Sequence, residues 1–413
     1  MNEYAKQTHI FRSWIIDRIF LGLTLGEYIK RLITPFNIGA GIIVLVGLVL
    51  IGIRFTQGLG AVTSASQEQP WGLFLAWGLF SGVPLSATGF VLGTAVYIFG
   101  LKEYHPVVKN AILIGFLGYL FAVIFLLVDL GRPWRLPYPM FVSFGTASVL
   151  FLVAWHVALY LSCQFLEFVP SICEWGGWKS LRKWALAMTI GLTIFGIILS
   201  TLHQSALGAM FLLAPGKLHP LWYSPYIPAL FLISAIAAGL CLVILASLLS
   251  KWFLKKQADP AYLASLDKIT LGLGTASSFV LITYFAVKII ALAHGDHWNL
   301  LLTPYGNLFL VELFIFALLP AFLFAFAGRR GKVGLVQFTA LLTIIGVVIN
   351  RLNVSLFAIN WQLPHREFFN WKEFLILLAI VTIQILVYRW IVNRMPVLRE
   401  HPEYKGEHAA TYT

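Results

Sequence analysis

The chain has 413 residues, of which 59% are hydrophobic and only 11% are charged. Soluble domains carry about 25% charged residues, so the composition excludes a water-covered globular protein and predicts an all-α integral membrane protein. The formal net charge of +12 then reflects membrane topology rather than nucleic-acid binding. The three cysteines have no C-x-x-C spacing, so no metal site is predicted.

Residues 1–34 are predicted to form a cytoplasmic segment. A signal peptide is not expected, because a short apolar block with a small-residue cleavage site is lacking. In "FRSWIIDRIFLGLTLGEYIKRL", the apolar residues Trp14, Ile15, Ile19 and Leu23 recur near helical spacing among charged residues. The pattern predicts one amphipathic helix that lies at the membrane interface before the first span.

Ten apolar segments follow, each near the roughly 20 residues that cross a bilayer. They are expected at 36–55, 71–100, 107–130, 141–168, 183–202, 227–251, 269–293, 306–327, 333–355 and 371–393. Because only short links separate them, we expect one membrane domain over residues 35–394, with about ten transmembrane helices packed in bundles. Residues 395–413 would form a cytoplasmic tail.

Lysine and arginine are distributed unevenly between the two sides of these spans. Of the 29 basic residues, 21 fall on the side that carries both ends of the chain. The positive-inside rule therefore predicts a multi-pass protein of the bacterial inner membrane with both termini in the cytoplasm. The outer links are poor in lysine but rich in His, Trp, Asn and Pro, which suits a docking surface or a pocket.

Two charged residues lie inside predicted spans near the outer boundary. Lys288 falls in the seventh span and Glu312 in the eighth, at similar depth. A charge in the bilayer is costly unless it is paired or hydrated, so we expect the two to form a buried ion pair. The pair could serve helix packing, or it could take part directly in a ligand site, and the sequence leaves both alternatives open.

The fourth span carries a polar stripe at helical spacing. His156, Tyr160, Gln164 and Glu167 share one face, and such a chain of titratable groups suits proton transfer. Polar contacts between helices are the alternative. A b-type haem is not expected, because His156 is the deep histidine and no histidine partner at its depth is evident.

Several motifs follow one another in a familiar order. They are "EQPWGLFLAWGLFSGVPLSATGF", "YHPVVKNAILIGFLGY", "LLVDLGRPWRLP", "LHQSALGAM" and "KLHPLW". Together they resemble the NrfD/PsrC family, the membrane subunits of polysulfide reductase and related complexes, and they look most like its HybB-like ten-helix branch. The preferred match within that branch is the membrane subunit (QrcD) of the quinone reductase complex of sulfate-reducing bacteria.

The resemblance implies a specific function. Family members bind menaquinone near the outer face without haem or metal in this chain, and exchange electrons with a periplasmic four-cluster iron–sulfur subunit. Further periplasmic molybdopterin-type and multihaem cytochrome c subunits and membrane lipids are the other implied partners, with no nucleic acid. The positions that match the family's quinone site are Asp129, Arg132, His203, Gln204, Ser205, Asn350 and Arg351.

This site would suit quinone chemistry, which needs a proton donor and hydrogen bonds to two carbonyl oxygens. We expect His203 to exchange protons and Asp129 to orient it. Arg132 and Arg135 would hold the charge of Asp129 or meet the partner, unless the segment is only a helix end with snorkelling arginines.

The preferred function is menaquinone reduction by a subunit of a quinone oxidoreductase complex. Coupling of this reaction to proton uptake from the cytoplasm through the stripe is a further hypothesis. One alternative is a hydrogenase-type or Hmc-type subunit that works in the opposite direction. Another is a transporter, for which Pro84 in the second span would mark a break in the helix. A passive anchor for redox subunits is the third.

Overall fold

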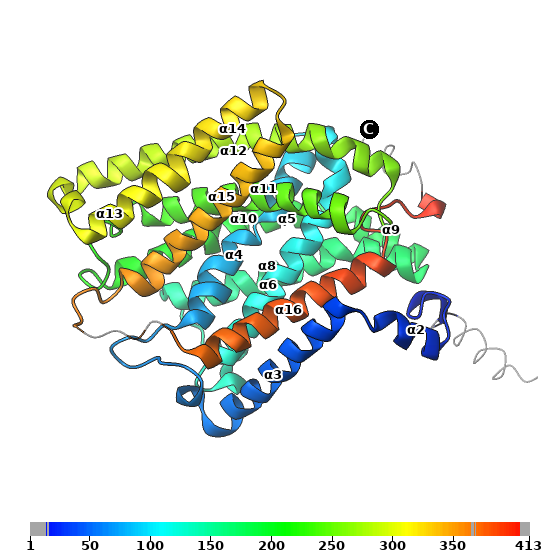
Figure 1. Cartoon of the computed structure of the whole chain (residues 1–413), viewed down its shortest axis with the longest axis horizontal. Coiled ribbons are helices and arrows are strands. Elements are labelled where there is room, and N and C mark those ends of the chain that lie inside the picture. Colours follow the sequence, from blue (N-terminus) through cyan, green and yellow to red (C-terminus); the bar gives the residue numbers. More distant parts are fainter. Residues whose placement is uncertain (1–13, 15, 365–366, 368, 405–413) are drawn as a thin grey trace, which may run out of the picture.

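The computed structural model describes residues 14, 16–364, 367 and 369–404. Parts of the predicted amino-terminal segment (1–13 and 15) and of the predicted tail (405–413) lie outside them. The described chain is helical apart from turns and one isolated bridge between Leu218 and Ile359. Figure 1 shows long helices running side by side, with α2 and the carboxyl terminus at the same end.

Within the described residues, ten helical segments are long and apolar enough to cross a membrane, which confirms the predicted fold class. Six are single α-helices, and four combine α-helical with π-helical or 3-10 pieces. All ten, in order, are α3 (Pro35–Gln57); η2 (Phe74–Ser81), α4 (Gly82–Leu85), α5 (Thr88–Gly93) and η3 (Thr94–Ile98); α6 (His105–Asp129); α8 (Val149–Gly176); α10 (Thr189–Ala209) with η6 (Met210–Leu213); α11 (Ile227–Phe253); α12 (Pro260–His294); α13 (Pro304–Leu310), η8 (Val311–Leu318) and α14 (Leu319–Arg329); α15 (Val333–Leu352) and η9 (Asn353–Phe357); and α16 (Trp371–Arg394).

These segments form two four-helix bundles and a pair. The first bundle contains the second to fifth spans, and the second bundle contains the sixth to ninth. Helices α10 and α11 pack against each other where the bundles meet, and α3 packs along α16 beside the first bundle (Figure 1). The face with α2 and residues 395–404 is called the terminal face here, and the other end is called the opposite face.

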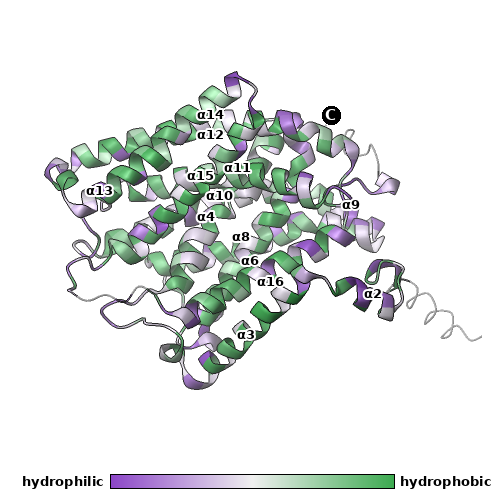
Figure 2. Cartoon of the chain, in the orientation of Figure 1, coloured by the Kyte–Doolittle hydropathy of each residue, from purple (hydrophilic) through white to green (hydrophobic). Residues whose placement is uncertain are grey.

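Hydropathy follows this arrangement. Figure 2 shows hydrophobic residues along the helices and hydrophilic residues concentrated toward the helix ends. Helix α3 is apolar on all sides, and Ile42, Leu45 and Val49 on it are exposed. An exposed apolar helix surface of this kind is stable only when lipid covers it.

Three predicted spans have wrong boundaries. The fourth span was expected at 141–168, but α8 begins at Val149, where Ser148 caps it, and ends before Gly177 in the left-handed conformation. The fifth span begins at Thr189 because a separate helix, α9 (Lys179–Ala187), precedes it. Helix α12 begins at Pro260, nine residues before the predicted start.

The amino-terminal segment is not one helix, contrary to the prediction. Leu21 and Gly22 have positive φ and turn the chain after a short helical stretch. Helix α2 (Leu25–Leu32) then begins at a capping box in which Thr24 and Glu27 bond each other's backbone N–H groups. Two shorter pieces therefore replace the single amphipathic helix.

Candidate functional site

A buried hydrogen-bond network in the first bundle centres on His203 of α10. Its Nδ1 lies 2.7 Å from the Leu199 carbonyl oxygen, which can only accept, so Nδ1 carries the proton of the neutral ring. Its Nε2 lies 2.6 Å from the Tyr119 hydroxyl of α6. In this tautomer Nε2 accepts, so Tyr119 donates its proton to His203.

Gln204 completes the shell around the Tyr119 hydroxyl. Its Nε2 donates to the Tyr119 oxygen at 3.0 Å and to the Val83 carbonyl oxygen at 3.1 Å. Val83 lies just before the break between α4 and α5 in the second span. The amide nitrogen is thus saturated, and the Gln204 Oε1 atom remains buried without a hydrogen-bond partner.

The polar stripe of α8 meets this network, so two features that the sequence presents separately lie together. The Tyr160 ring centroid lies 4.7 Å from that of Tyr119 and 5.3 Å from that of His203. Gln164 Nε2 donates to the Tyr160 hydroxyl at 3.0 Å. Glu167 accepts from the Thr193 hydroxyl at 3.1 Å.

Glycines allow Gln164 to enter the bundle. A Cβ atom at Gly89 or Gly115 would lie 2.6 or 2.5 Å from the Gln164 Nε2 atom, closer than any real contact. Because both positions lack a side chain, the second and third spans admit the amide between them. Substitution at either glycine would displace the middle of the stripe.

Several polar atoms around this network have no partner among the described residues. They are Gln204 Oε1, Gln164 Oε1, Ser200 Oγ and His156 Nδ1. Buried polar groups in proteins are nearly always hydrogen-bonded. A cluster of unpartnered ones indicates a place for water or for the polar part of a ligand.

The depth of the stripe differs from the prediction. Because α8 continues to Gly176, Glu167 lies nine residues, or about 14 Å, inside the end of the helix. It nevertheless lines a small cavity of about 40 Å³ with His105 and Lys109, which lie near the terminal face. The stripe therefore reaches that face through a cavity rather than at the helix end.

A second buried network lies in the second bundle and is charged. The Nζ atom of Lys288 lies 3.4 Å from the Glu312 Oε1 atom. Glu312 also accepts from Asn350 Nδ2 at 2.6 Å, Asn353 Nδ2 at 2.9 Å and Trp222 Nε1 at 2.9 Å. Four donors thus surround one buried carboxylate.

Arg351 extends this second network. Its guanidinium donates to Asn350 Oδ1 at 2.9 Å, to Ser234 Oγ at 2.7 Å and to the Phe231 carbonyl at 3.1 Å, and lies 3.6 Å from the Phe231 ring centroid. The sequence interpretation grouped Asn350 and Arg351 with His203. In the described part of the chain, no hydrogen bond joins them to it, and they belong with the ion pair instead.

Asp129 lies at the end of α6, but its neighbouring arginine is not the one expected. The Arg54 guanidinium of α3 donates to the Val128 and Leu130 carbonyl oxygens on either side of Asp129 and interacts with its charge. Arg132 and Arg135 are exposed, and Arg135 lies over the Tyr138 ring at 5.3 Å. The expectation that Arg132 and Arg135 hold the charge of Asp129 is therefore wrong, and Arg54 is the arginine that interacts with it.

A second buried carboxylate lies near Asp129. Glu373 of α16 accepts from the Phe74 N–H at 3.0 Å, at the start of the second span. Gly72 makes room for it, since a Cβ atom there would lie 2.3 Å from the Glu373 Oε1 atom. Asp129 and Glu373 interact electrostatically, so the opposite end of the first bundle holds two carboxylates beside one arginine.

Ser205 takes no part in the hydrogen bonds described around His203. It is partly buried on α10, next to Gln204. Its neighbours in the sequence therefore account for the polar chemistry of the "HQS" motif.

An aromatic cap covers the second network at the opposite face. His219 stacks on Tyr305 at 4.5 Å and contacts the Trp361 ring at 4.8 Å and the Trp222 ring at 5.7 Å. Burial lowers the pKa of His219 to about 4, with a smaller contribution from the nearby His297. His219 is therefore neutral at pH 7, and Trp222 connects the cap to Glu312.

Sequence reasoning missed Tyr119, Arg54, Glu373 and Trp222. A signal existed for Tyr119, because a tyrosine within an apolar span needs a hydrogen-bond partner. For Arg54 and Glu373, both near span ends, snorkelling to water was the simpler interpretation. Their partners come from distant parts of the chain, which no local pattern reveals.

The network does not fit an axial haem ligand at His203. Both imidazole nitrogens of His203 are within hydrogen-bond distance of other groups, so neither is free for iron. The structure does place His156 near enough to His203 for their charges to interact, which the sequence did not indicate. Among the described residues, no group of three His, Cys, Asp or Glu side chains could hold a metal ion.

Ten spans with a buried polar network in each bundle define a multi-pass membrane protein. The chain belongs to the family described as "Polysulphide reductase, NrfD", which matches residues 61–360. Members similar to it are membrane subunits of oxidoreductases.

Three relatives illustrate the similarity. A Nitratidesulfovibrio vulgaris protein, named only "Protein", is 47% identical over 92% of this chain and 98% of its own length. The "Probable Ni/Fe-hydrogenase 2 b-type cytochrome subunit" of Escherichia coli is 30% identical over 90% of this chain and 94% of its own. The "Menaquinone reductase, integral membrane subunit" of N. vulgaris is 27% identical over 77% of this chain and 79% of its own.

Proposed function

We propose that this chain is the quinone-binding membrane subunit of a periplasm-facing respiratory oxidoreductase. It would exchange electrons between a periplasmic iron–sulfur subunit and menaquinone, its substrate. The observation that carries the proposal is the first-bundle network, where buried polar atoms without partners surround the Tyr119–His203 pair. The relative named as a menaquinone reductase subunit supports the choice of quinone.

The network has the groups that quinone chemistry needs. Gln204 Oε1 is a free acceptor for a quinol hydroxyl, and Tyr119 is a hydroxyl donor within the same shell. A proton that reaches His203 Nε2 occupies the lone pair to which Tyr119 donates. Tyr119 must then turn its proton toward another acceptor, so the pair can pass a proton to a substrate oxygen.

Asp129 is proposed to act at the opposite end of the first bundle and His203 deeper within it. The expectation that Asp129 orients His203 is wrong, because the Leu199 carbonyl and the Tyr119 hydroxyl hold both ring nitrogens. His203 lies six residues before the end of α10, and Asp129 is the last residue of α6. Arg54 places a positive charge beside Asp129, which favours the ionised form of that carboxyl group. Arg132, Gln204 and Ser205 remain part of the proposed quinone site, with Arg132 at its exposed rim.

We propose that protons come from the terminal face along the stripe. Glu167 receives them from the cavity that His105 and Lys109 line, and Gln164 and Tyr160 lead toward His203. With His156 beside His203, the route ends at the proposed quinone site. Water at the unpartnered Gln164 Oε1 atom would bridge the remaining gap.

The topology inferred from the basic residues gives this route its direction. With both termini in the cytoplasm of a bacterial inner-membrane protein, the terminal face is cytoplasmic and the opposite face is periplasmic. The link at 130–148 exposes Trp134 (68%), Phe141 (79%) and Phe144 (61%) on that face. Exposed aromatic residues of this kind suit a docking surface for the iron–sulfur subunit, with molybdopterin-type and multihaem cytochrome c subunits beyond it.

Menaquinone reduction is the preferred direction. The alternative is a hydrogenase-type subunit. It is supported by the sequence identity, which is 30% to the E. coli hydrogenase subunit and 27% to the menaquinone reductase subunit. In either case His203 would not serve as a haem ligand, because neither of its ring nitrogens is free for iron.

The test is quinone turnover in the purified, fully assembled complex. His203→Ala and Asp129→Asn should each reduce turnover by at least about 100-fold while the partner subunits remain bound. His294→Ala is a matched control, because His294 is exposed at the end of α12 and lies outside the network. Normal turnover in both variants, or a quinone ring bound near the terminal face, would refute the proposed site.

A further inference from the structure

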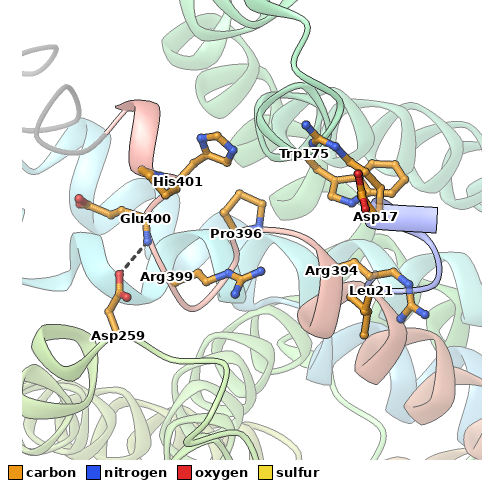
Figure 3. A pocket seen from close by; sticks show the side chains of 11 residues that line it. Asp17, Leu21, Trp175, Asp259, Arg394, Pro396, Arg399, Glu400 and His401 are labelled. Carbon is orange, nitrogen blue, oxygen red and sulfur yellow. Dashed lines mark hydrogen bonds between the residues drawn. The ribbon is translucent and has the colours of Figure 1, made fainter. Parts of the chain in front are cut away.

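The terminal face carries a pocket of about 460 Å³ where the amino-terminal segment meets residues 394–402. Figure 3 shows Arg394 and Arg399 beside Pro396, and Asp17 near Trp175 across the hollow. Arg18 and Leu21 also line it. Groups of both charge signs and an apolar wall therefore share one cavity, which the proposed quinone function does not use.

Arg394 builds the wall of this pocket. Its guanidinium donates to the Ile19 carbonyl at 2.8 and 3.1 Å, to the Tyr28 hydroxyl at 2.6 Å and to the Trp390 carbonyl at 3.2 Å. It thereby ties the amino-terminal segment to the end of α16. Asp259 is likewise engaged, because its Oδ2 accepts from the Glu400 N–H at 2.9 Å (Figure 3).

Other charges of the pocket are available to a ligand. Arg18, Arg399 and Asp17 all line the hollow. Across residues 14, 16–364, 367 and 369–404, no ion pair joins any two of them. Opposite charges around one cavity that do not pair with each other suit a ligand that itself carries both signs.

The pocket lies at the level where lipid headgroups are found. Trp175 on its wall lies 5.4 Å from Trp14 and 6.3 Å from Trp390, measured between ring centroids. Tryptophan collects at membrane–water interfaces, and Trp178, Trp184 and Trp252 are exposed on the same face. The helix ends at Gly176 and Arg394 place the cavity beside the ends of two spans.

We infer that this pocket binds the headgroup of a zwitterionic phospholipid that carries a phosphodiester and a primary ammonium group. Arg18 and Arg399 hold the phosphate, and Asp17 holds the ammonium. An anionic headgroup would leave Asp17 to repel it. Leu21, Trp175 and Pro396 give the apolar wall that the glycerol and upper acyl chains need, which free phosphoethanolamine would not use.

The test is native mass spectrometry of the full-length chain in detergent, titrated with phosphatidylethanolamine, phosphatidylglycerol or free phosphoethanolamine. Arg18→Gln/Arg399→Gln should weaken phosphatidylethanolamine binding about 25-fold, roughly fivefold for each arginine. Lys255→Gln/Lys256→Gln is the matched control, because it removes two exposed charges of the same face outside the pocket. It should leave binding within twofold of the unaltered chain.

Asp17→Asn distinguishes the two ends of the ligand and guards against a misfolded double variant. It should weaken phosphatidylethanolamine binding and leave phosphatidylglycerol binding unchanged or stronger. Equal losses in the pocket and control variants would overturn the inference, as would tighter binding of phosphatidylglycerol to the unaltered chain. Equal binding of free phosphoethanolamine would overturn the assignment to a lipid. The outcome is independent of quinone turnover.

Discussion

The two bundles solve the problem of buried polar groups in opposite ways. The first holds a neutral network around Tyr119 and His203 in which several acceptors remain open. The second holds a charged network in which Glu312 accepts from four donors. Open positions allow protons or a ligand to enter, whereas a carboxylate held by four donors resists any change of charge.

Irregular helices accompany the second network. Glu312 lies in the π-helix η8, and Asn353 begins the π-helix η9. Each π-turn inserts an extra residue and reorients the side chains that follow, which allows Glu312 and Asn353 to meet across two helices. The second span in the first bundle also contains π-turns and a break after α4, so irregularity alone does not separate a chemical site from a structural one.

The largest expected effect is the loss of one partner in the second bundle. Glu312→Gln leaves Lys288 and Arg351 buried without a compensating carboxylate, which typically costs about 3–5 kcal/mol. We expect a strongly lowered thermal midpoint in detergent, measured by intrinsic fluorescence. Quinone turnover per assembled complex should stay near normal if the network is structural.

The matched control removes both charges of the pair. Lys288→Met/Glu312→Gln should be less destabilised than the sum of the single variants, because the unpaired ammonium of Lys288 is gone. Additive losses would show that the 3.4 Å contact carries no coupling. Loss of turnover in a stable double variant would instead assign chemistry to the second bundle and break the comparison.

The next effect concerns turnover rather than stability. Tyr119→Phe keeps the ring but removes the hydroxyl that joins His203 and Gln204. We expect quinone turnover to fall about 100-fold, while stability falls by only about 1 kcal/mol for the lost hydrogen bonds. Tyr388→Phe is a suitable control, because its hydroxyl bonds Asn110 away from the His203 network.

Much of the architecture follows from local sequence patterns. Apolar length predicts ten spans, since a helix must satisfy its own backbone in lipid. Helical spacing places His156, Tyr160, Gln164 and Glu167 on one face, and the contacts of Tyr160 with Tyr119 and His203 follow that face. The meeting of Lys288 with Glu312 follows from their equal depth on consecutive spans.

The remaining features depend on contacts between distant segments. Arg54 reaches α6 from the first span, and Asn350 and Arg351 turn toward Glu312 rather than His203. A motif states which residues are near in sequence but not which bundle they face. The start of α8 was misplaced because residues 141–148 are apolar enough to continue a span, although turns occupy them.

The third prediction tests the proton route of the first bundle. Glu167→Gln keeps the size of the side chain and its contact with Thr193 but removes a titratable group. In reconstituted vesicles we expect less membrane potential per electron, or slower turnover, with normal electron entry from the partner. No potential in the wild type would mean that protons come from the other side, and an unchanged potential in the variant would place the route on another helix.

The smallest expected effect concerns pH and the cap of the second bundle. The pKa of His219 is about 4 in the folded chain and about 6.5 when unfolded, so the unfolded state binds more protons between these values. Stability should therefore be complete above about pH 6.5 and fall as pH decreases toward 4.

In His219→Asn, the amide oxygen can replace Nδ1 as acceptor of the Leu221 N–H without titrating. Between pH 7 and pH 5 the wild type should lose about 2 kcal/mol more than this variant, and thermal midpoints at the two pH values measure the difference. His294→Asn, on an exposed histidine of the same face, should keep the wild-type slope. If His219→Asn keeps it too, protonation of the cap is not coupled to folding, and the second bundle tolerates an added charge better than its saturated network implies.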